Sequence, residues 1–389
     1  MLPTGDRLTR EDKAIVVRFA GARRLLSTSV LNGGCRTDLS CLFNYCEVYG
    51  KADERCTMRA ATYEEHLCLL AEELGLDPLF TTGLSTAAKM KYAQINSESH
   101  KDFSVTVIAT GGIDVNGSRA GDPALWHEHN GRSYPYEPGT INILVFIDAK
   151  LKEAALTRAL VTVTEAKTAA LQEVLAPSCY SRGLATGSGT DGTIIVSNLE
   201  APVALTDAGQ HSKLGEYIGR VVKNTVKAGL TAENGFISYA CSSILRRIGR
   251  FGITEEGLWG KYCSLKNPFN LNRDDFRCRL MRLDKDSSLM ALAAVYAHIL
   301  DLLDWNLIDN RAALRMVRDL LKGNTAGIIE KSKPAAVKFN STGDCKIDPF
   351  QPLKDLKSIT IQDISAPEMI EQLVACFSWF LVACLIYEL

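Results

Sequence analysis

Two charged side chains stand close together in a segment made mostly of small residues. Glu165 and Lys167 place a carboxylate and an amine two residues apart, among Ala, Thr and Val. On a regular helix, residues two apart point about 200° away from each other, so both reach one pocket only near a helix start. The apolar setting favours burial, and a buried carboxylate or amine has the perturbed proton affinity that acid–base catalysis uses. The alternative is a pair of solvated helix charges.

A glycine-rich segment at residues 187–192 presents Ser188, Thr190 and Asp191. Phosphate-binding loops follow a strand and open a helix, whereas this segment precedes the strand-like residues 193–197 and lacks a Gly-Lys-Ser/Thr sequence. We therefore predict a turn that presents its polar side chains for chemistry. A tight hairpin that needs glycine for positive φ is the alternative.

Histidine offers two further candidates. His211 follows a glycine at an expected helix start, where it serves as a general base, a ligand, or only a surface or capping residue. His127 and His129 flank Glu128, but no third ligand follows at helical spacing and the H-E-x-x-H pattern is absent. No G-x-S-x-G nucleophile elbow is present either. We predict neither a bound metal nor a cofactor.

Strands and helices must position these groups. Residues 14–19 and 24–28 form strand-like runs around Gly21 and predict a hairpin. The later strands are predicted at 103–109, 141–147 and 193–197, and the polar connection 111–137 is too long for a passive turn. A helix is expected between 148 and 175, interrupted near 161–164 and restarting with Thr164 as its N-cap.

Beyond residue 232 the pattern becomes helical, with helices predicted at 236–250, 275–303 and 311–322. Residues 289–297 are all apolar, which predicts a helix buried on all sides. The fold class is therefore α+β: a mixed β-sheet core packed with helices in residues 1–232, and a mainly helical C-terminal part in residues 233–389.

Composition limits the partners and the location. The 389 residues carry a net charge of -1 without a basic run, so nucleic acid is not expected as a partner. The 12 cysteines form no C-x-x-C pair, which predicts free thiols in a reducing cytosol. The N-terminus lacks the apolar region of a signal peptide. Residues 373–387 are uncharged but fall short of the ~20 residues needed to span a bilayer. They predict a buried helix or an oligomer contact, in a cytoplasmic protein.

Five ordered blocks resemble the adenosylcobinamide amidohydrolase family. They cover residues 110–122, 139–143, 164–171, 185–191 and 211–219. Ser188 stands where the family pattern has a threonine, which conserves a hydroxyl. The resemblance spans roughly residues 20–230 and implies hydrolysis of the amide between the corrin ring and the aminopropanol arm. The residues after 232 lie outside it and are assigned only to packing or oligomerisation.

The resemblance also implies roles for individual residues. A cleft for the corrinoid substrate needs polar groups at its rim, and the candidates are Asn44, Arg119, Thr140, Asn142, Ser188 and Lys213. Glu165 or Asp191 activates water or a hydroxyl, and His211 or Lys167 protonates the leaving amine. Backbone N–H groups of the 187–192 turn, together with Lys167, stabilise the oxyanion. A variant of this scheme makes Thr190 or Ser188 the nucleophile.

Two other functions compete with this interpretation. A corrinoid-binding protein without activity would keep the pocket but would not need Glu165, Lys167, Asp191 and His211 together. A metal-dependent hydrolase of another amide would use His127 and His129.

Overall fold

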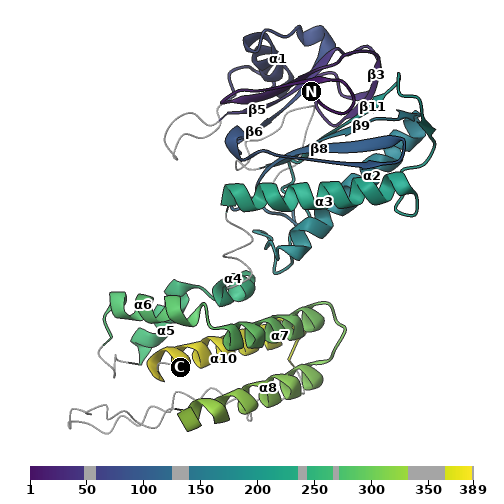
Figure 1. Cartoon of the computed structure of the whole chain (residues 1–389). Coiled ribbons are helices and arrows are strands. Elements are labelled where there is room, and N and C mark those ends of the chain that lie inside the picture. The colour runs from purple at the N-terminus through teal and green to yellow at the C-terminus, as the bar shows by residue number, and fades with distance from the viewer. Residues whose placement is uncertain (48–57, 125–139, 235–242, 266–270, 332–363, 388–389) are drawn as a thin grey trace. The chain divides into compact units, whose positions relative to one another are not determined.

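The chain folds into two compact units, Met1–Cys241 and Ser242–Leu389 (Figure 1). The computed structural model describes residues 1–47, 58–124, 140–234, 243–265, 271–331 and 364–387. The sequence-predicted boundary near residue 232 lies within α3 (Lys213–Asn234), the last described helix of the N-terminal unit.

Two β-sheets pack face to face in the N-terminal unit. One has the strand order β1-β2-β5-β6, formed by Arg7–Arg10, Ala14–Arg18, Cys41–Cys46 and Thr81–Thr86. The other has the order β4-β3-β11-β9-β8-β7, formed by Gly34–Arg36, Arg23–Ser27, Gly192–Asn198, Thr140–Ile147, Phe103–Gly112 and Gln94–His100. Alternate side chains of each sheet face the other, so that Leu42 of β5 and Phe146 of β9 share one apolar core.

Helices cover both outer faces, giving a four-layer arrangement (Figure 1). Helix α1 (Tyr63–Glu73) packs on the four-stranded sheet through Leu67 and Leu70, and it begins with the capping box of Thr62 and Glu65. Helices α2 (Glu153–Glu173) and α3 pack on the six-stranded sheet through a second set of alternating residues. A two-stranded pair, β10 (Lys150–Leu151) with β12 (Ala204–Leu205), completes the unit.

The predicted strands at 103–109, 141–147 and 193–197 are confirmed as β8, β9 and β11. The predicted hairpin at 14–28 is wrong, because β2 pairs with β1 and β5 whereas β3 pairs with β11 and β4 in the other sheet. The short connection crosses from one sheet to the other, and the buried ion pair of Arg23 with Asp6 holds it there, with 2.8 Å between Nη2 and Oδ1.

Helix α2 runs without interruption, so the predicted restart at Thr164 is also wrong. The hydroxyls of Thr162 and Thr164 donate to the carbonyl oxygens four residues earlier, at 3.3 and 2.9 Å. Packing keeps the helix continuous, because Val163 on the same stretch is fully buried against the sheet.

The C-terminal unit consists of helices. They are α4 (Ile244–Ile248), α5 (Glu255–Ser264), α6 (Arg273–Leu283), α7 (Ser287–Asp304), α8 (Asn310–Lys331) and α10 (Ala366–Tyr387). The predicted helix at 275–303 is two helices, because Asp284 bonds back to Ser243 and Asp286 caps the start of α7. Mixed sheets with this helical unit confirm the α+β class.

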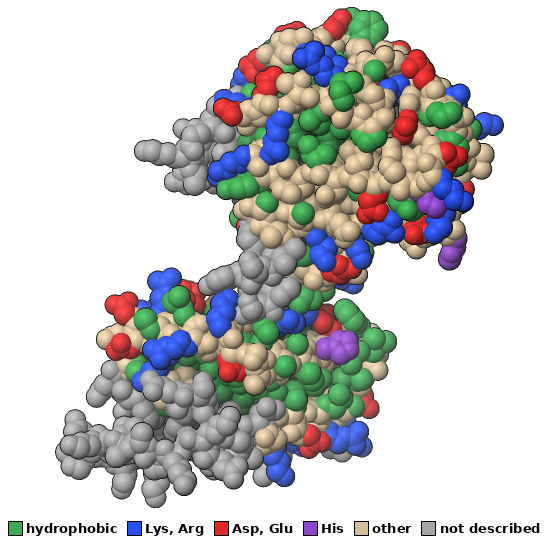
Figure 2. Space-filling model, in the orientation of Figure 1, with side chains coloured by type: hydrophobic (Ala, Val, Ile, Leu, Met, Phe, Trp, Pro, Cys, Tyr) green, Lys and Arg blue, Asp and Glu red, His purple; other side chains and the backbone are tan. Residues whose placement is uncertain are grey.

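Burial in this unit is uneven. Val295 on α7 is 49% exposed, so the prediction that residues 289–297 are buried on all sides is wrong. Hydrophobic side chains gather on the visible face over α7 (Figure 2). By length and composition α7 and α10 could cross a membrane, but 72% of the apolar window of α10 is buried within the unit, against 39% for α7. Helix α10 is thus the central core helix, with the Phe377 ring 4.2 Å from that of Tyr296.

Candidate functional site

Several of the polar residues singled out by the sequence meet at one edge of the six-stranded sheet, where strands β8, β9 and β11 begin or end. Strands β9 and β11 are parallel and connected through α2, and both begin at this edge. Strand β8 runs antiparallel to β9 and ends here, with Gly112 opposite Thr140. The glycine-rich turn before β11 therefore lies beside the start of β9 and the end of β8.

Asp191 and Lys167 form an ion pair at this edge, with side chains 11% and 12% exposed. The Asp191 carboxylate also accepts hydrogen bonds from the Ser188 hydroxyl, at 2.5 Å, and from the backbone N–H groups of Ser188 and Ile141, at 3.2 and 3.1 Å. These donors come from α2, the turn and β9. The carboxylate is therefore oriented from three sides, which is the pre-organisation that catalysis requires.

A chain of hydroxyl groups leads outward from this carboxylate. The Ser188 hydroxyl, which donates to Asp191, lies 3.1 Å from the Thr190 hydroxyl. Ser188 is buried whereas Thr190 is partly exposed. Thr140 donates to the Thr190 carbonyl oxygen at 2.7 Å and fixes the end of the turn. Thr190 is thus the outermost hydroxyl of a relay that ends at Asp191.

Glycine is required in this turn for two different reasons. Gly189 has φ of +79°, as the hairpin-type alternative expected. A Cβ at Gly187 would press on the Asp191 carboxylate and stand 2.9 Å from Lys167 Nζ. A Cβ at Gly192 would stand 2.8 Å from Asn142 Oδ1. Gly187 and Gly192 therefore allow the helix and the neighbouring strand to approach the turn.

Asn44 and Asn142 lie behind the turn, between the two sheets. The Asn142 amide donates to Asn44 Oδ1 at 2.7 Å and to the Ser85 carbonyl oxygen at 2.9 Å, and Asn44 donates to the Thr110 hydroxyl at 3.0 Å. Both asparagines are 1% exposed. The structure places these predicted rim residues inside the protein, where they join the two sheets next to the turn.

The connection after β8 closes over the other side of the turn. The Ser118 N–H donates to the Gly187 carbonyl oxygen at 2.8 Å. Half-buried Arg119 donates to the Leu184 carbonyl oxygen at 3.3 Å. Burial opposes ionisation of Asp122, but hydrogen bonds from Ser178 and from the Arg119 backbone outweigh it and lower the pKa of this carboxyl. Asp122 and Ser178 thus brace the loop, a role that the sequence did not predict.

Three predicted residues lie away from this cluster. Glu165 is exposed and accepts a 2.5 Å hydrogen bond from Gln210, since it points to the opposite side of α2 from Lys167. The prediction that Glu165 is buried is therefore wrong. His211 is exposed in the turn before α3, and Lys213 pairs with Glu216 on the surface at 2.6 Å. These residues share the side of α2 that Glu165 faces.

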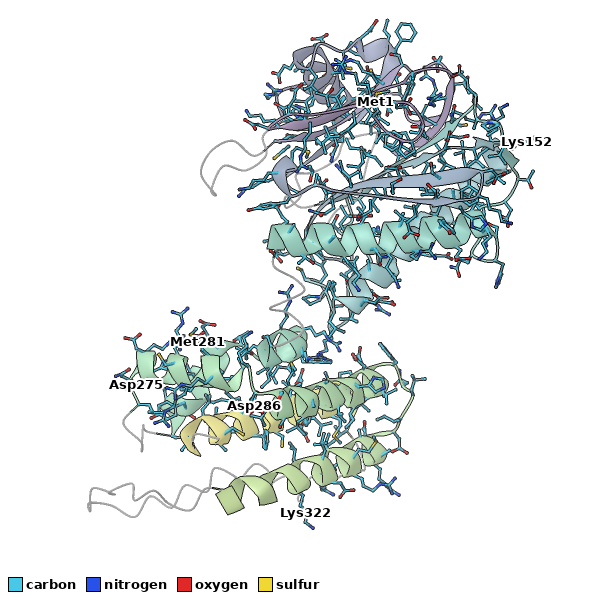
Figure 3. All side chains as sticks on the ribbon, viewed as in Figure 1. Met1, Lys152, Asp275, Met281, Asp286 and Lys322 are labelled. Carbon is cyan, nitrogen blue, oxygen red and sulfur yellow. The ribbon has the colours of Figure 1, made fainter. Side chains whose placement is uncertain are left out.

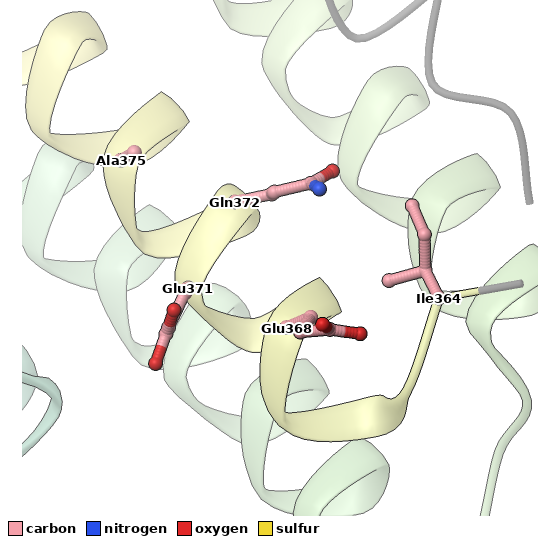
Figure 4. A pocket seen from close by; sticks show the side chains of 5 residues that line it. All are labelled: Ile364, Glu368, Glu371, Gln372 and Ala375. Carbon is pink, nitrogen blue, oxygen red and sulfur yellow. The ribbon is translucent and has the colours of Figure 1, made fainter.

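The described residues contain no group of His, Cys, Asp and Glu suited to hold a metal ion. His127 and His129 lie outside the described residues. A hollow of about 440 Å³ in the C-terminal unit is lined by Ile364, Glu368, Glu371, Gln372 and Ala375 (Figure 4). Among the described residues its lining includes no amine, and the Glu368 carboxylate accepts from the Ser365 hydroxyl at 2.8 Å, so the hollow lacks the carboxylate–amine pair found in the N-terminal unit.

A family model described as adenosylcobinamide amidohydrolase matches residues 2–237, which is more than half of the chain. The chain belongs to the adenosylcobinamide amidohydrolase family. The match covers the unit that carries the turn, Lys167 and the relay. The residues matched by the family model therefore include the whole candidate site, from Lys167 to the glycine-rich turn.

The chain is also similar to two curated proteins. An adenosylcobinamide amidohydrolase of Methanosarcina mazei is 28% identical over 57% of this chain and 95% of its own length. An uncharacterized protein of Methanocaldococcus jannaschii, MJ1613, is 29% identical over 59% of this chain and 90% of its own length. Among solved structures, the PH0078 protein from Pyrococcus horikoshii aligns over 60% of this chain and 80% of its own, with 12% identity and a TM-score of 0.31.

Proposed function

We propose that this protein hydrolyses the amide bond between the corrin ring and the aminopropanol arm of adenosylcobinamide, releasing adenosylcobyric acid and 1-amino-2-propanol. We further propose that it acts in corrinoid salvage in the cytoplasm. The observation that supports the reaction is the relay of Thr190, Ser188, Asp191 and Lys167 at the sheet edge. A binding protein would have no need for an oriented carboxylate beside an amine and two hydroxyls.

The nucleophile in this proposal is the Thr190 hydroxyl. Its proton passes to Ser188 Oγ as the Ser188 proton passes to Asp191, while Thr190 Oγ1 bonds to the amide carbon. The ammonium of Lys167 lies against the same carboxylate, close enough to the turn to stabilise the oxyanion and to give a proton to the departing amine. The C–N bond breaks, and water then hydrolyses the threonyl ester.

The backbone groups of the turn contribute less to the oxyanion than the sequence suggested. The N–H groups of Gly187, Ser188 and Thr190 donate to Ser118, Asp191 and the Ser188 hydroxyl respectively. Each backbone amide has one N–H, which is already engaged, whereas the Lys167 ammonium keeps further N–H donors beside its bond to Asp191 and is therefore the favoured electrophilic group. Half-buried Arg119, in the loop that closes over the turn, is the proposed contact to a corrin rim amide, whereas buried Thr140 keeps its role in fixing the turn.

The test compares Asp191→Asn with Glu165→Gln. Each change removes one carboxylate charge, from the glycine-rich turn in the first variant and from α2 in the second. Only Asp191 belongs to the relay, so we expect kcat to fall about 100-fold or more in Asp191→Asn and to stay unchanged in Glu165→Gln. Adenosylcobinamide turnover is followed by chromatography and mass spectrometry, with and without a chelator. Equal turnover in both variants would overturn the assignment of Asp191.

The nucleophile is tested with Thr190→Ala and Thr190→Ser. The serine variant keeps a hydroxyl and is expected to retain activity, whereas the alanine variant loses it. Mass spectrometry of acid-quenched enzyme should show a corrinoyl ester on the wild-type chain. Full activity of the alanine variant would instead assign the attack to water.

A further inference from the structure

A second hollow, of about 540 Å³, lies in the N-terminal unit and is unusually rich in cations. Among the described residues, its lining includes four basic side chains, Arg10, Lys13, Lys89 and Lys91, and two acidic ones, Glu11 and Asp12, with Cys46 also lining it. Charged side chains of both signs are otherwise interspersed on the visible face of this unit (Figure 2). The excess of positive charge is therefore local to the hollow.

The basic side chains are held together by the backbone beneath them. Arg10 donates from Nη2 to the carbonyl oxygen of Met90, at 2.5 Å, and this residue separates Lys89 from Lys91. The Met90 side chain is fully buried and anchors the short η2 helix (Met90–Tyr92). The Lys91 ammonium lies 4.7 Å from the centre of the Tyr92 ring. The Arg10 guanidinium is therefore held at the turn that carries Lys89 and Lys91.

The positive charges of Lys89 and Lys91 are only partly balanced by their surroundings. In the described part of the chain, no carboxylate lies within ion-pair distance of the Lys89 or Lys91 ammonium. The nearby Glu233 carboxylate accepts a hydrogen bond from the Lys89 backbone N–H at 3.1 Å. Burial raises the pKa of Glu233, and the positive charges of Lys89 and Lys91 partly offset this increase. Like charges held close together repel, and a bound anion relieves that repulsion.

The hollow lies at the same edge of the sandwich as the candidate active site. Cys46, in its lining, is the last residue of β5, about 7 Å along the strand from Asn44. Asn44 in turn bonds to Asn142, which is paired with Gly192 at the start of β11. A ligand in the hollow would therefore reach toward the turn along the ends of the strands.

We propose that this hollow binds an oxyanion of the phosphate class. A phosphate presents several acceptor oxygens and close to two negative charges, which suits a guanidinium with flanking ammonium groups. Two sources supply such an anion: a phosphate ester carried by the substrate, or a separate phosphate ligand. The first source rests on the proposed function, whereas the binding site itself does not.

The test measures inorganic phosphate binding to the full-length protein by titration calorimetry at low salt. The Lys89→Ala/Lys91→Ala variant should bind at least about tenfold more weakly, because two charge-assisted contacts are lost. The matched control is Lys150→Ala/Lys152→Ala, which removes two exposed lysines near the start of α2, where Lys152 is labelled in Figure 3. It should bind as the wild type does.

Absence of saturable phosphate binding by the wild type, or equal weakening in the control, would overturn the proposal. Neither measurement depends on turnover, so failure of the proposed hydrolysis leaves this test intact.

The source of the phosphate is then decided by kinetics. A raised KM in the Lys89→Ala/Lys91→Ala variant only for a phosphate-bearing corrinoid amide identifies the substrate as the source. An unchanged KM for both phosphate-bearing and phosphate-free substrates, with phosphate binding lost, identifies a separate ligand.

Discussion

Replacing Gly187 with alanine tests whether the distance between α2 and the glycine-rich turn controls activity. The added methyl would press on the Asp191 carboxylate and stand 2.9 Å from Lys167 Nζ, where ordinary contact begins at 3.4 Å. The ion pair must therefore shift by at least about half an ångström, and a misplacement of about 1 Å can cost about 100-fold in rate. We expect kcat for adenosylcobinamide to fall between tenfold and 100-fold.

The fold should survive this change, because the crowded groups are the ends of side chains at the edge of the unit. Overpacking of this kind costs about 1–3 kcal/mol in the free energy of unfolding. The matched control is Gly219→Ala, because a Cβ there meets nothing within 4 Å and the position lies inside α3. That variant should be as active as the wild type and slightly more stable. Wild-type kcat in Gly187→Ala would refute the claim that the ion pair must keep its present geometry.

Three other outcomes follow from the buried polar groups. Asn142→Ala leaves the buried Oδ1 of Asn44 without its donor, so chemical denaturation should show a loss of about 1–3 kcal/mol in the free energy of unfolding. Asp6→Ala leaves the fully buried Arg23 guanidinium with only the exposed Glu200 carboxylate, 4.0 Å away, as a counter-charge and should cost about 3–5 kcal/mol; a smaller loss than for Asn142→Ala would contradict this ranking. Asp122→Asn should lower the melting temperature at neutral pH. Because the folded pKa of Asp122 is lowered from 3.8, its stabilising effect is present above that value and disappears as the pH falls below it, so the difference from wild type should shrink in acid.

The sequence predicted the strands that carry the site better than the topology that joins them. Runs of β-branched residues identified β8, β9 and β11, because both faces of these strands are buried. No local pattern states that β2 and β3 belong to different sheets, since both sides of that short connection read as strands. The sheet to which each strand belongs is decided by its pairing partner, which is β5 for β2 and β11 for β3, and neither partner is adjacent in the sequence.

The candidate site divides along a similar line. Lys167, Asp191, Ser188 and Thr190 were predicted and lie together, whereas Glu165 faces the other side of α2. Residues two apart on a regular helix point about 200° away from each other, which favoured this separation. The predicted helix start at Thr164 would have relaxed that constraint, but that prediction was wrong. The rim role predicted for Asn44 and Asn142 rested on the resemblance together with the polarity of their side chains, and polarity does not distinguish a ligand contact from a buried hydrogen bond.

The pairing of β3 with β11 has a consequence for the order of events during synthesis. The guanidinium of Arg23, the first residue of β3, gains its hydrogen bond to Asn198 only after that residue, 175 positions later in the chain, has been synthesised. Translation adds about 5–20 residues per second, so the N-terminal strands spend roughly ten seconds or more outside the ribosome without their central neighbour. During that interval β3 has an open edge on the side that β11 later occupies. A nascent chain that stalls before residue 192 is therefore expected to be the form of this protein most dependent on chaperones.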